Sequence, residues 1–198
     1  MEAVIEQSIK DKRGLELTVN AHNTLAISLY SRLGFVTKTA VTTMRGINID
    51  KNLMKIYASM QTESQSSHCR KMEEKDVERC KKYCIENGGL PLTFQLKFNA
   101  RAIVCYDKDE KNLLGYSLGF QPSCHTLVND DCIFFSLLSF FCESFPSENP
   151  HFFVSLSHHS SLLNKCILVG FKMIKNSFWM TRGENLEMPT KTIFLPAI

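Results

Sequence analysis

The chain lacks the features that mark several classes of protein. Its 198 residues contain no N-x-S/T glycosylation acceptor, no secretory signal peptide and no C-x-x-C pair among the eight cysteines. A disulfide-rich secreted domain is therefore not indicated, and a reduced cytoplasmic or nuclear setting is expected. The longest apolar run, Ile133 to Cys142, has ten residues and is interrupted by serines. It suits a core helix and is too short to cross a bilayer.

A strong charge of one sign is also absent. The 23 Lys and Arg residues against 20 Asp and Glu give a formal net charge of +3, and the basic residues are scattered. We expect neither nucleic acid nor a membrane as partner. No metal site is predicted either. Cys80 and Cys84 lie one helical turn apart and Cys124 adjoins His125, but zinc sites usually show paired short spacings.

The most informative feature of the sequence is an internal repeat. Residues 15–46, LELTVNAHNTLAISLYSRLGFVTKTAVTTMRG, recur at 152–183 as FFVSLSHHSSLLNKCILVGFKMIKNSFWMTRG, with an offset of 137 or 136 positions. Each copy predicts a strand of alternating apolar residues, a helix opened by small polar residues, a Gly-Phe pair and a second strand. The sequence thus predicts a β-α-β unit used twice.

The first copy carries a more specific pattern than its periodicity. It resembles the GNAT family of acetyl-CoA-dependent N-acyltransferases, whose cofactor-binding half has the pattern V-x-x-x-N-x-x-A-x-x-L-Y-x-x-x-G-F. Seven positions match in order and spacing: Val19, Asn23, Ala26, Leu29, Tyr30, Gly34 and Phe35. The resemblance covers residues 1 to about 58.

The resemblance implies acetyl-CoA as cofactor and a small-molecule or peptide amine as substrate. It assigns Tyr30 as the catalytic residue that protonates the departing thiolate, and Asn23 and Ala26 as cofactor-binding residues. Structural explanations stand beside these roles. Asn23 is also a good helix N-cap, and a tyrosine on an amphipathic helix is often a core or boundary residue.

The pattern is incomplete in front of the repeat. Residues 1–13 resemble the helix that follows the R/Q-x-x-G-x-G/A loop in this family, but the loop is absent from the chain. A glycine loop at a helix N-terminus would present backbone N–H groups to a pyrophosphate. We therefore expect an N-terminally truncated tandem acetyltransferase with impaired activity. The strand Leu15 to Val19 would lack a neighbour, so either the second domain covers it or the fragment self-associates.

Three segments follow from these patterns: residues 1–59 as the C-terminal half of one acetyltransferase domain, 60–68 as linker and 69–198 as a second domain. Beyond the repeat we expect strands at 53–58 and 192–195, helices at 74–86 and 132–145, and a hairpin from 102–106 and 113–119. Residues 69–198 are expected to fold independently, with residues 1–58 more labile. The predicted fold class is α/β (α+β), a GNAT-like mixed sheet flanked by helices, in one partial and one complete copy.

The second copy looks degenerate. Where the glycine loop belongs the chain has HTLVNDDC, with two acids, and the places of Asn23 and Tyr30 hold His159 and Cys166. His158 and His159 suggest either a base or a solvated helix start, and Cys166 either a nucleophile or a buried thiol. The alternative to an acyltransferase is thus a non-catalytic binding or structural module.

Overall fold

The computed structural model describes residues 3, 5–7, 14–60, 67–87, 100–121, 124, 126–156, 159–183 and 193–195. Most of the helix expected in residues 1–13 and most of the expected linker lie outside the described residues, as do His125 and His158.

The first sheet is built from both copies of the repeat. It has four antiparallel strands in the order β1-β8-β2-β7, which are β1 (Leu15–Asn20), β2 (Val36–Gly46), β7 (His151–Ser155) and β8 (Phe171–Arg182). The second strand of each copy pairs with the first strand of the other copy, and β2 and β8 pair with each other in the centre. The two copies have therefore exchanged strands within one chain.

This sheet has an approximate two-fold symmetry. Val41 of β2 lies opposite Ser177 of β8, and these residues are 136 positions apart, the offset of the repeat. A bulge leaves Lys38 unmatched on β2, and another leaves Ile174 unmatched on β8, again 136 positions apart. Bulges bend a strand and increase its twist. The paired bulges show that the two copies retain the same local irregularity.

The repeat helices begin and end as the sequence predicts. Asn23 caps α2 (Thr24–Arg32), and glycines with positive φ follow α2 and α6 (Ser160–Val169): Gly34 at 85° and Gly170 at 105°. A side chain at Gly170 would strike the carbonyl oxygen of Asn48. Glycine is therefore required there both by its conformation and by the approach of the first copy.

The second sheet has five antiparallel strands in the order β3-β4-β5-β6-β9. They are β3 (Ser67–Lys71), β4 (Ile103–Asp107), β5 (Leu113–Ser117), β6 (Thr126–Val128) and β9 (Ile193–Leu195). A 3-10 turn (Glu74–Asp76) leads into α4 (Val77–Glu86), and α5 (Asp131–Ser144) packs beside α3 (Lys51–Ser59). The predicted hairpin, the α4 helix, the final strand and the α5 helix are confirmed.

Two large cores and one small one hold these layers together. The first lies around α5 and includes Phe134, Phe152 and Phe171, while the second lies between α4 and the sheets and includes Tyr116 and Trp179. The small core joins α2 to β1 and β8. Because α5 is apolar on nearly every side, it is buried by helices on one side and strands on the other.

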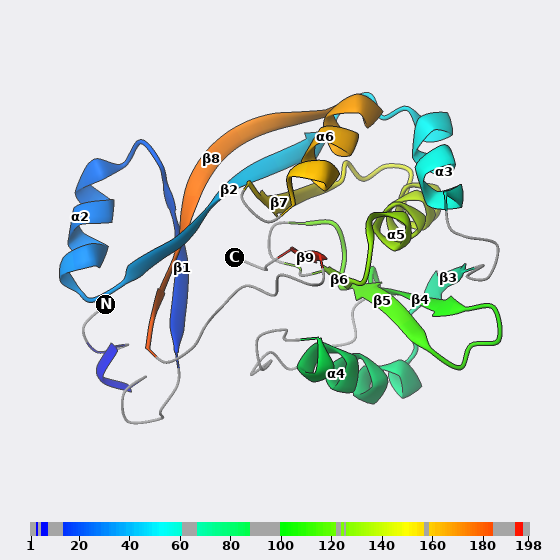
Figure 1. Ribbon diagram of the computed structural model, residues 1–198, viewed down its shortest axis with the longest axis horizontal. Helices are drawn as coiled ribbons and strands as arrows, with labels where there is room; N and C mark the ends of the chain where they lie inside the picture. Colours follow the sequence, from blue (N-terminus) through cyan, green and yellow to red (C-terminus); the bar gives the residue numbers. More distant parts are fainter. Residues whose placement is uncertain are drawn as a thin grey trace.

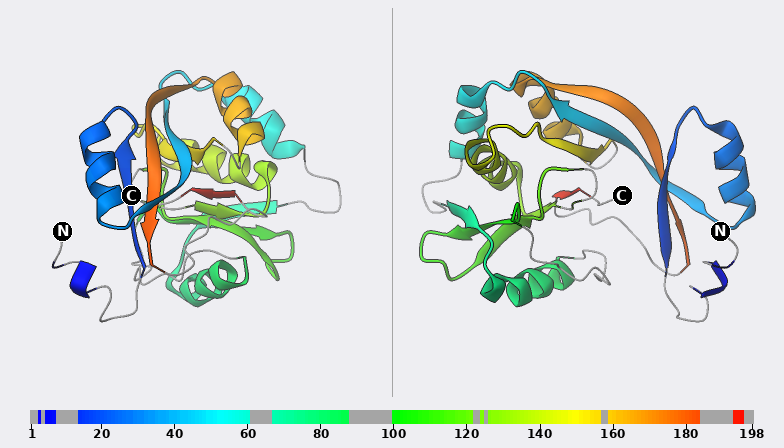
Figure 2. Two further views of the ribbon diagram at one scale, coloured as in Figure 1. Left: turned by 60° about the vertical axis from the view of Figure 1, so that its left-hand side comes forward. Right: turned by 180° about the vertical axis from the view of Figure 1, so that it is seen from behind.

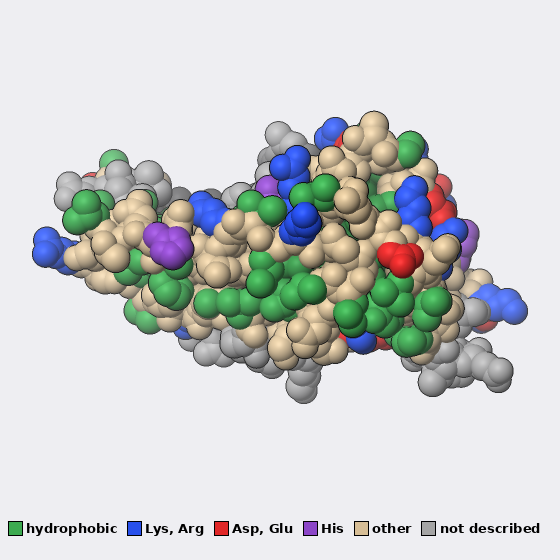
Figure 3. All heavy atoms as spheres, turned by 90° about the horizontal axis from the view of Figure 1, so that it is seen from above, with side chains coloured by type: hydrophobic (Ala, Val, Ile, Leu, Met, Phe, Trp, Pro, Cys, Tyr) green, Lys and Arg blue, Asp and Glu red, His purple; other side chains and the backbone are tan. Residues whose placement is uncertain are grey.

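The molecule is elongated (Figure 1). A small lobe contains α2 and β1, and a larger lobe contains α3, α4, α5, α6 and the second sheet, as both views of Figure 2 show. The long strands β2 and β8 run from one lobe to the other. Hydrophobic side chains are spread over the face seen in Figure 3, and exposed apolar residues lie on α6 and at the start of β8.

The α/β class is confirmed, with two corrections. The described strand pairs are all antiparallel rather than mixed, because β7 pairs with β2 instead of extending the second sheet. Residues 53–58, predicted as a strand, belong to α3. The Asp50 side chain accepts hydrogen bonds from the backbone N–H groups of Asn52 and Leu53 at 2.9 and 3.0 Å, which starts a helix. Met54 then faces α5.

The sheet crosses the expected boundary between the two domains. Both neighbours of β8 come from residues 15–46, so residues 69–198 alone would leave both edges of β8 unpaired. The strand Leu15 to Val19 does receive a neighbour from the second copy. Independent folding of residues 69–198 stays a prediction, but it would cost this pairing and expose Trp179.

A cut between the copies should not separate them. With residues 61–66 replaced by a specific protease site, we expect the two fragments to co-elute in size-exclusion chromatography after cleavage, with unchanged Trp179 fluorescence. The physical reason is the pairing of β2 with both β7 and β8. The control is Val41→Pro, which removes a ladder donor at the centre and should allow separation. Fragments that separate without this change would contradict the strand exchange.

A buried carboxylate fixes the start of α4. Asp76 accepts two hydrogen bonds from Arg70 at 2.7 and 2.9 Å, one from the Tyr106 hydroxyl at 2.8 Å and one from the Glu73 N–H at 2.8 Å. Burial by itself would raise the pKa of Asp76, but these donors outweigh it and hold the pKa below the ordinary value of 3.8. The cluster therefore ties the helix to β3 and β4.

Asp76→Asn should lower the free energy of unfolding at pH 7 by about 3 kcal/mol, because Arg70 loses its counter-charge. Since the folded pKa lies below 3.8, this stabilisation is present above that value and is lost as the pH falls through the folded pKa. In urea unfolding, the difference in free energy of unfolding between the unmodified protein and Asp76→Asn should be smaller at pH 3 than at pH 7. Asp109→Asn, in the exposed hairpin turn, is the control, and an equal gap at both pH values would contradict the role of ionised Asp76.

Candidate functional site

The predicted site residues all lie on or beside α2. The Asn23 side-chain oxygen accepts a hydrogen bond from the Ala26 backbone N–H at 3.1 Å, so Asn23 is the N-cap of the helix. No described residue bonds to its side-chain amino group, which is exposed and can donate to a ligand. The capping role is thus realised, and one donor of the residue remains available.

Tyr30 lies about two turns after Asn23 on the same helix. Its half-buried ring meets the edge of Phe35 at a centroid distance of 5.9 Å and packs on the small core with Leu17 and Val19 of β1. The Tyr30 hydroxyl has no hydrogen-bond partner among the described residues. The boundary position predicted for this tyrosine is confirmed, and its proton is not committed to a structural bond.

The strand beside this helix has an open edge. Among the described strands β1 pairs with β8 alone, so its other edge leaves backbone N–H and C=O groups without a ladder partner. An open strand edge and a free tyrosine hydroxyl are both properties that a site for an amide-containing ligand needs. The structure brings Asn23, Ala26 and Tyr30 together with this strand in the small lobe (Figure 1).

The second copy has lost these properties. His159 is buried at the start of α6, and its side chain does not cap the helix. Cys166, in the place of Tyr30, is fully buried, and burial raises the pKa of its thiol. A buried thiol with a raised pKa is a poor nucleophile and a poor acid at neutral pH. The interpretation of Cys166 as a buried core thiol is confirmed.

The N-terminus of α5 is occupied by the protein's own carboxylates. The Asp130 side chain accepts a hydrogen bond from the Ile133 N–H at 2.8 Å and caps the helix. Asp131 accepts from Lys165 at 2.6 Å and from the Ser161 hydroxyl at 3.2 Å. Burial opposes the charge on Lys165, but Asp131 raises the pKa of Lys165 above its ordinary value. A phosphate at this helix end would meet two carboxylates.

The strand next to that helix end is also occupied. β6 has β5 on one side and β9 on the other, with Leu127 opposite Phe194. It therefore offers no open edge to a ligand. The N-terminus of α5 and the edges of β6 are therefore both occupied. β7, the repeat equivalent of β1, does keep an open edge, since among the described strands of the first sheet it pairs with β2 alone.

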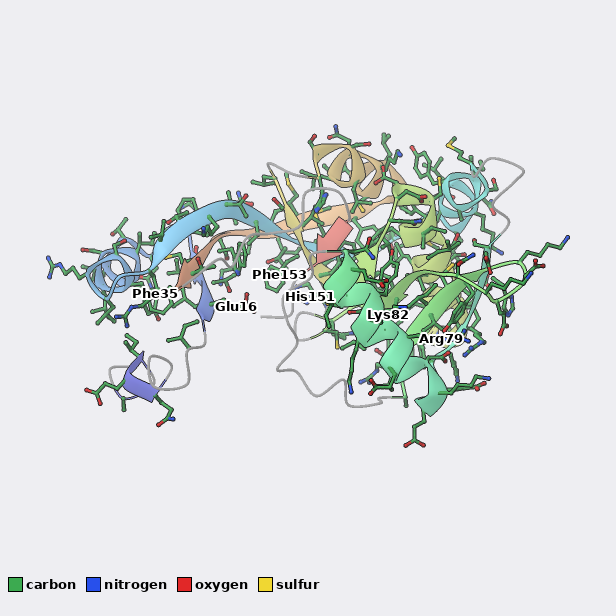
Figure 4. The ribbon with its side chains drawn as sticks, turned by 60° about the horizontal axis from the view of Figure 1, so that its bottom comes forward. Glu16, Phe35, Arg79, Lys82, His151 and Phe153 are labelled. Carbon is green, nitrogen blue, oxygen red and sulfur yellow. The ribbon has the colours of Figure 1, made fainter. Side chains whose placement is uncertain are left out.

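A polar face of the first sheet was not anticipated from the sequence. The buried hydroxyl residues on this face come from three strands: Thr39, Thr43, Ser155, Ser177 and Thr181. Two groups with shifted pKa values share it, Glu16 near one edge and His151 at the other, and Figure 4 labels both. The alternating threonines of β2 indicate one polar face of that strand in the sequence. The polar face of the whole sheet can be recognised only when the strand pairing between the two copies is known.

The two titratable groups have shifted pKa values. Burial raises the pKa of Glu16, although its carboxylate accepts a hydrogen bond from Trp179 Nε1 at 3.3 Å. Burial and the charge of Arg45 lower the pKa of His151. The His151 Nε2 atom is buried and has no hydrogen-bond partner. Buried polar atoms without partners are uncommon in folded proteins and call for a physical explanation.

The part of the chain that the structure describes contains neither a metal-binding cluster nor a helix of membrane-spanning length. No three side chains of His, Cys, Asp or Glu gather there to hold a metal ion. None of the helices in the described ranges is both long enough and apolar enough to span a bilayer.

Comparison with known proteins adds information on the fold. No protein-family model and no curated protein matches the sequence. A protein from Pyrococcus horikoshii assigned as an acetyltransferase aligns with a TM-score of 0.52 and 8% identity, over 96% of this chain and 62% of that one. A protein of unknown function from Staphylococcus epidermidis aligns at 0.51 and 7%, over 92% and 77%.

A GCN5-related N-acetyltransferase from Sphaerobacter thermophilus aligns at 0.48 and 9%, over 96% of this chain and 69% of that one, a score too low to carry an argument. The fold is GNAT-like, in agreement with the sequence motif around Tyr30. At such identities the likeness concerns the fold, and this chain spans only 62% of the Pyrococcus protein. Activity therefore has to be argued from the site.

The Cys166 thiol should resist alkylation in the native protein. At pH 8 we expect iodoacetamide to modify Cys166 more than about tenfold more slowly than the partly exposed Cys132, because burial blocks access and raises the thiol pKa. Mass spectrometry of digests measures both rates, and the difference should vanish in urea. Equal rates in the native state would restore the nucleophile hypothesis.

Proposed function

We propose that this chain is part of an acetyl-CoA-dependent N-acyltransferase that transfers an acetyl group to an amine. The observation that carries the proposal is the hydroxyl of Tyr30, which forms no hydrogen bond to a described residue, on a helix that packs against β1, a strand with one open edge among the described strands. The seven matching motif positions and the GNAT-like fold support it. The amine is a small molecule or a peptide amine.

The first copy is the half that fits the cofactor. Asn23 can donate from its side-chain amino group at the start of α2, whereas the start of α5 presents carboxylates and the neighbouring strand β6 is paired on both sides. When bound, acetyl-CoA supplies an activated acetyl thioester. The residues named here would hold the cofactor arm against α2.

Tyr30 supplies the proton for the leaving group. With acetyl-CoA bound, the acetyl thioester would be the group attacked by the amine, and Tyr30 would give its hydroxyl proton to the sulfur as the carbon–sulfur bond broke. The amine loses its own proton to a base or to water, which lets the tyrosinate recover a proton. An acid within reach of the sulfur contributes typically 10²–10⁴-fold to such a step, a rough guide to its effect here.

We infer that the activity of this chain is impaired. It has no R/Q-x-x-G-x-G/A loop, and the helix start that would replace it in the second copy is neutralised by Asp130 and Asp131. A specific observation also favours a structural role for the second copy: β8 is the neighbour of both β1 and β2. The second candidate function is therefore a non-catalytic module that completes the sheet of the first copy.

Calorimetric titration of acetyl-CoA into the chain and into Tyr30→Phe tests the proposal. We expect acetyl-CoA to bind with a dissociation constant in the micromolar to millimolar range. Tyr30→Phe should keep this affinity within about twofold, because the hydroxyl protonates the leaving thiolate and does not contribute to binding of acetyl-CoA. With an amine acceptor panel, the same variant should lose about tenfold or more of any acetyl transfer.

Asn23→Ser separates binding from capping. Serine keeps the N-cap but removes the amide donor, so acetyl-CoA binding should weaken while the melting temperature stays nearly constant. Absence of acetyl-CoA binding by the unmodified chain would reject the acyltransferase proposal for this chain and leave the structural module.

A further inference from the structure

Three nitrogen-bearing side chains form a row across neighbouring strands of the first sheet. His151 of β7 lies directly opposite Arg45 of β2, and Arg45 lies directly opposite Lys172 of β8. Residues directly opposite in antiparallel strands share a face and have Cβ atoms about 5 Å apart. Lys175, opposite Thr43, extends the row on the same face. We call these four residues the cation row.

The cation row is unfavourable as it stands. Like charges directly opposite each other destabilise a sheet, and Arg45 and Lys172 form such a pair. Arg45, Lys172 and Lys175 are exposed, and none forms an ion pair with a described acid. Glu148, three residues before His151, is already engaged by Arg101 and Gln121. The described acids therefore supply no counter-charge to the row.

Exposed lysines and arginines are often merely hydrated, and alone they would mark no site. His151 distinguishes this row. Its Nε2 atom is buried on the strand opposite the exposed Arg45 and has no hydrogen-bond partner among the described residues, so the row contains an unused hydrogen-bonding atom. Phe153, on the same strand and face, borders it, as the labelled side chains of Figure 4 show.

We infer that the cation row is a binding site for a diphosphate group, with Arg45 and Lys172 neutralising its charge and His151 Nε2 completing its hydrogen bonds. Arginine pairs with phosphate through two parallel N–H bonds, and lysine adds a mobile point charge. A row about 10 Å long on three strands matches a ligand with two linked phosphates better than a single small anion. His151 donates to a phosphate oxygen when its Nε2 carries the proton.

The cation row is separate from the Tyr30 site. Tyr30 packs against Phe178 and Met180, whereas Trp179, between them on β8, shares the polar face with Thr39 and hence with Thr43 and Arg45. Successive residues of a strand point to opposite faces. The inference therefore does not depend on the proposed acyltransferase function. A diphosphate can come from inorganic pyrophosphate or from a nucleotide, and both share the chemistry recognised here.

The test uses the full chain with ¹⁵N-labelled histidine. Sodium pyrophosphate is titrated at constant ionic strength, and the imidazole nitrogen signals of His151, assigned with His151→Asn, are followed by NMR. We expect a saturable shift of the Nε2 signal. The double variant Arg45→Gln/Lys172→Gln should weaken the apparent affinity by more than about tenfold, which corresponds to about 1.4 kcal/mol.

The control variant removes the same charge elsewhere. Arg32→Gln/Lys38→Gln takes two exposed cations from α2 and β2, away from His151, and should leave the affinity within about twofold. A second titration with ADP distinguishes a nucleotide source from free pyrophosphate. Circular dichroism and urea unfolding check that each variant is folded.

The inference is overturned if His151 shows no saturable shift with either probe up to about 10 mM, a range in which non-specific phosphate contacts already bind. It is equally overturned if the control variant weakens binding as much as Arg45→Gln/Lys172→Gln, since the effect would then be one of net charge. Either result would mean that the cation row is a hydrated surface and that the Nε2 atom of His151 binds no diphosphate.

Discussion

The pairing of β2 with β8 is the interaction on which the rest of the structure depends. These two strands run side by side through the centre of the first sheet, and each carries the outer strand of the other copy on its far edge. Because Val41 meets its repeat equivalent Ser177, the two copies are related as the subunits of a strand-exchanged dimer would be. The paired strands β2 and β8 position the small lobe, and β8 provides the neighbour of β1.

The exchange also explains why the two copies diverged. The first copy keeps Tyr30 half-buried on a helix that has no fully buried residue. In the second copy the corresponding helix is packed into the main core through Leu162, Cys166 and Val169. A tyrosine in place of Cys166 would overfill that core. Burial of Cys166 stabilises the fold but leaves no exposed reactive group at this position. The half-buried Tyr30 contributes less to the core.

The polar face of the first sheet follows from the same arrangement. Thr39 bonds to Ser155 across 116 positions of sequence at 3.3 Å, and Trp179 bonds to Glu16 across 163 positions. Such contacts require strands of different copies to share a face. They place two groups with shifted pKa values, Glu16 and His151, on one surface of a sheet whose other surface is apolar.

The sequence by itself determined the local elements. The caps at Asn23 and Asp130, the glycine turns at Gly34 and Gly170, and the alternating strands of the repeat are set by short-range hydrogen bonding and sterics, so they could be predicted. It missed the helix at Lys51–Ser59, where one aspartate cap and packing against α5 outweighed a short apolar run. Only the tertiary structure decided which strands pair, because two similar copies offer each strand two acceptable partners and the choice rests on long-range burial. The motif around Tyr30 was therefore visible in the sequence, while the row of His151, Arg45 and Lys172 required the register of three strands.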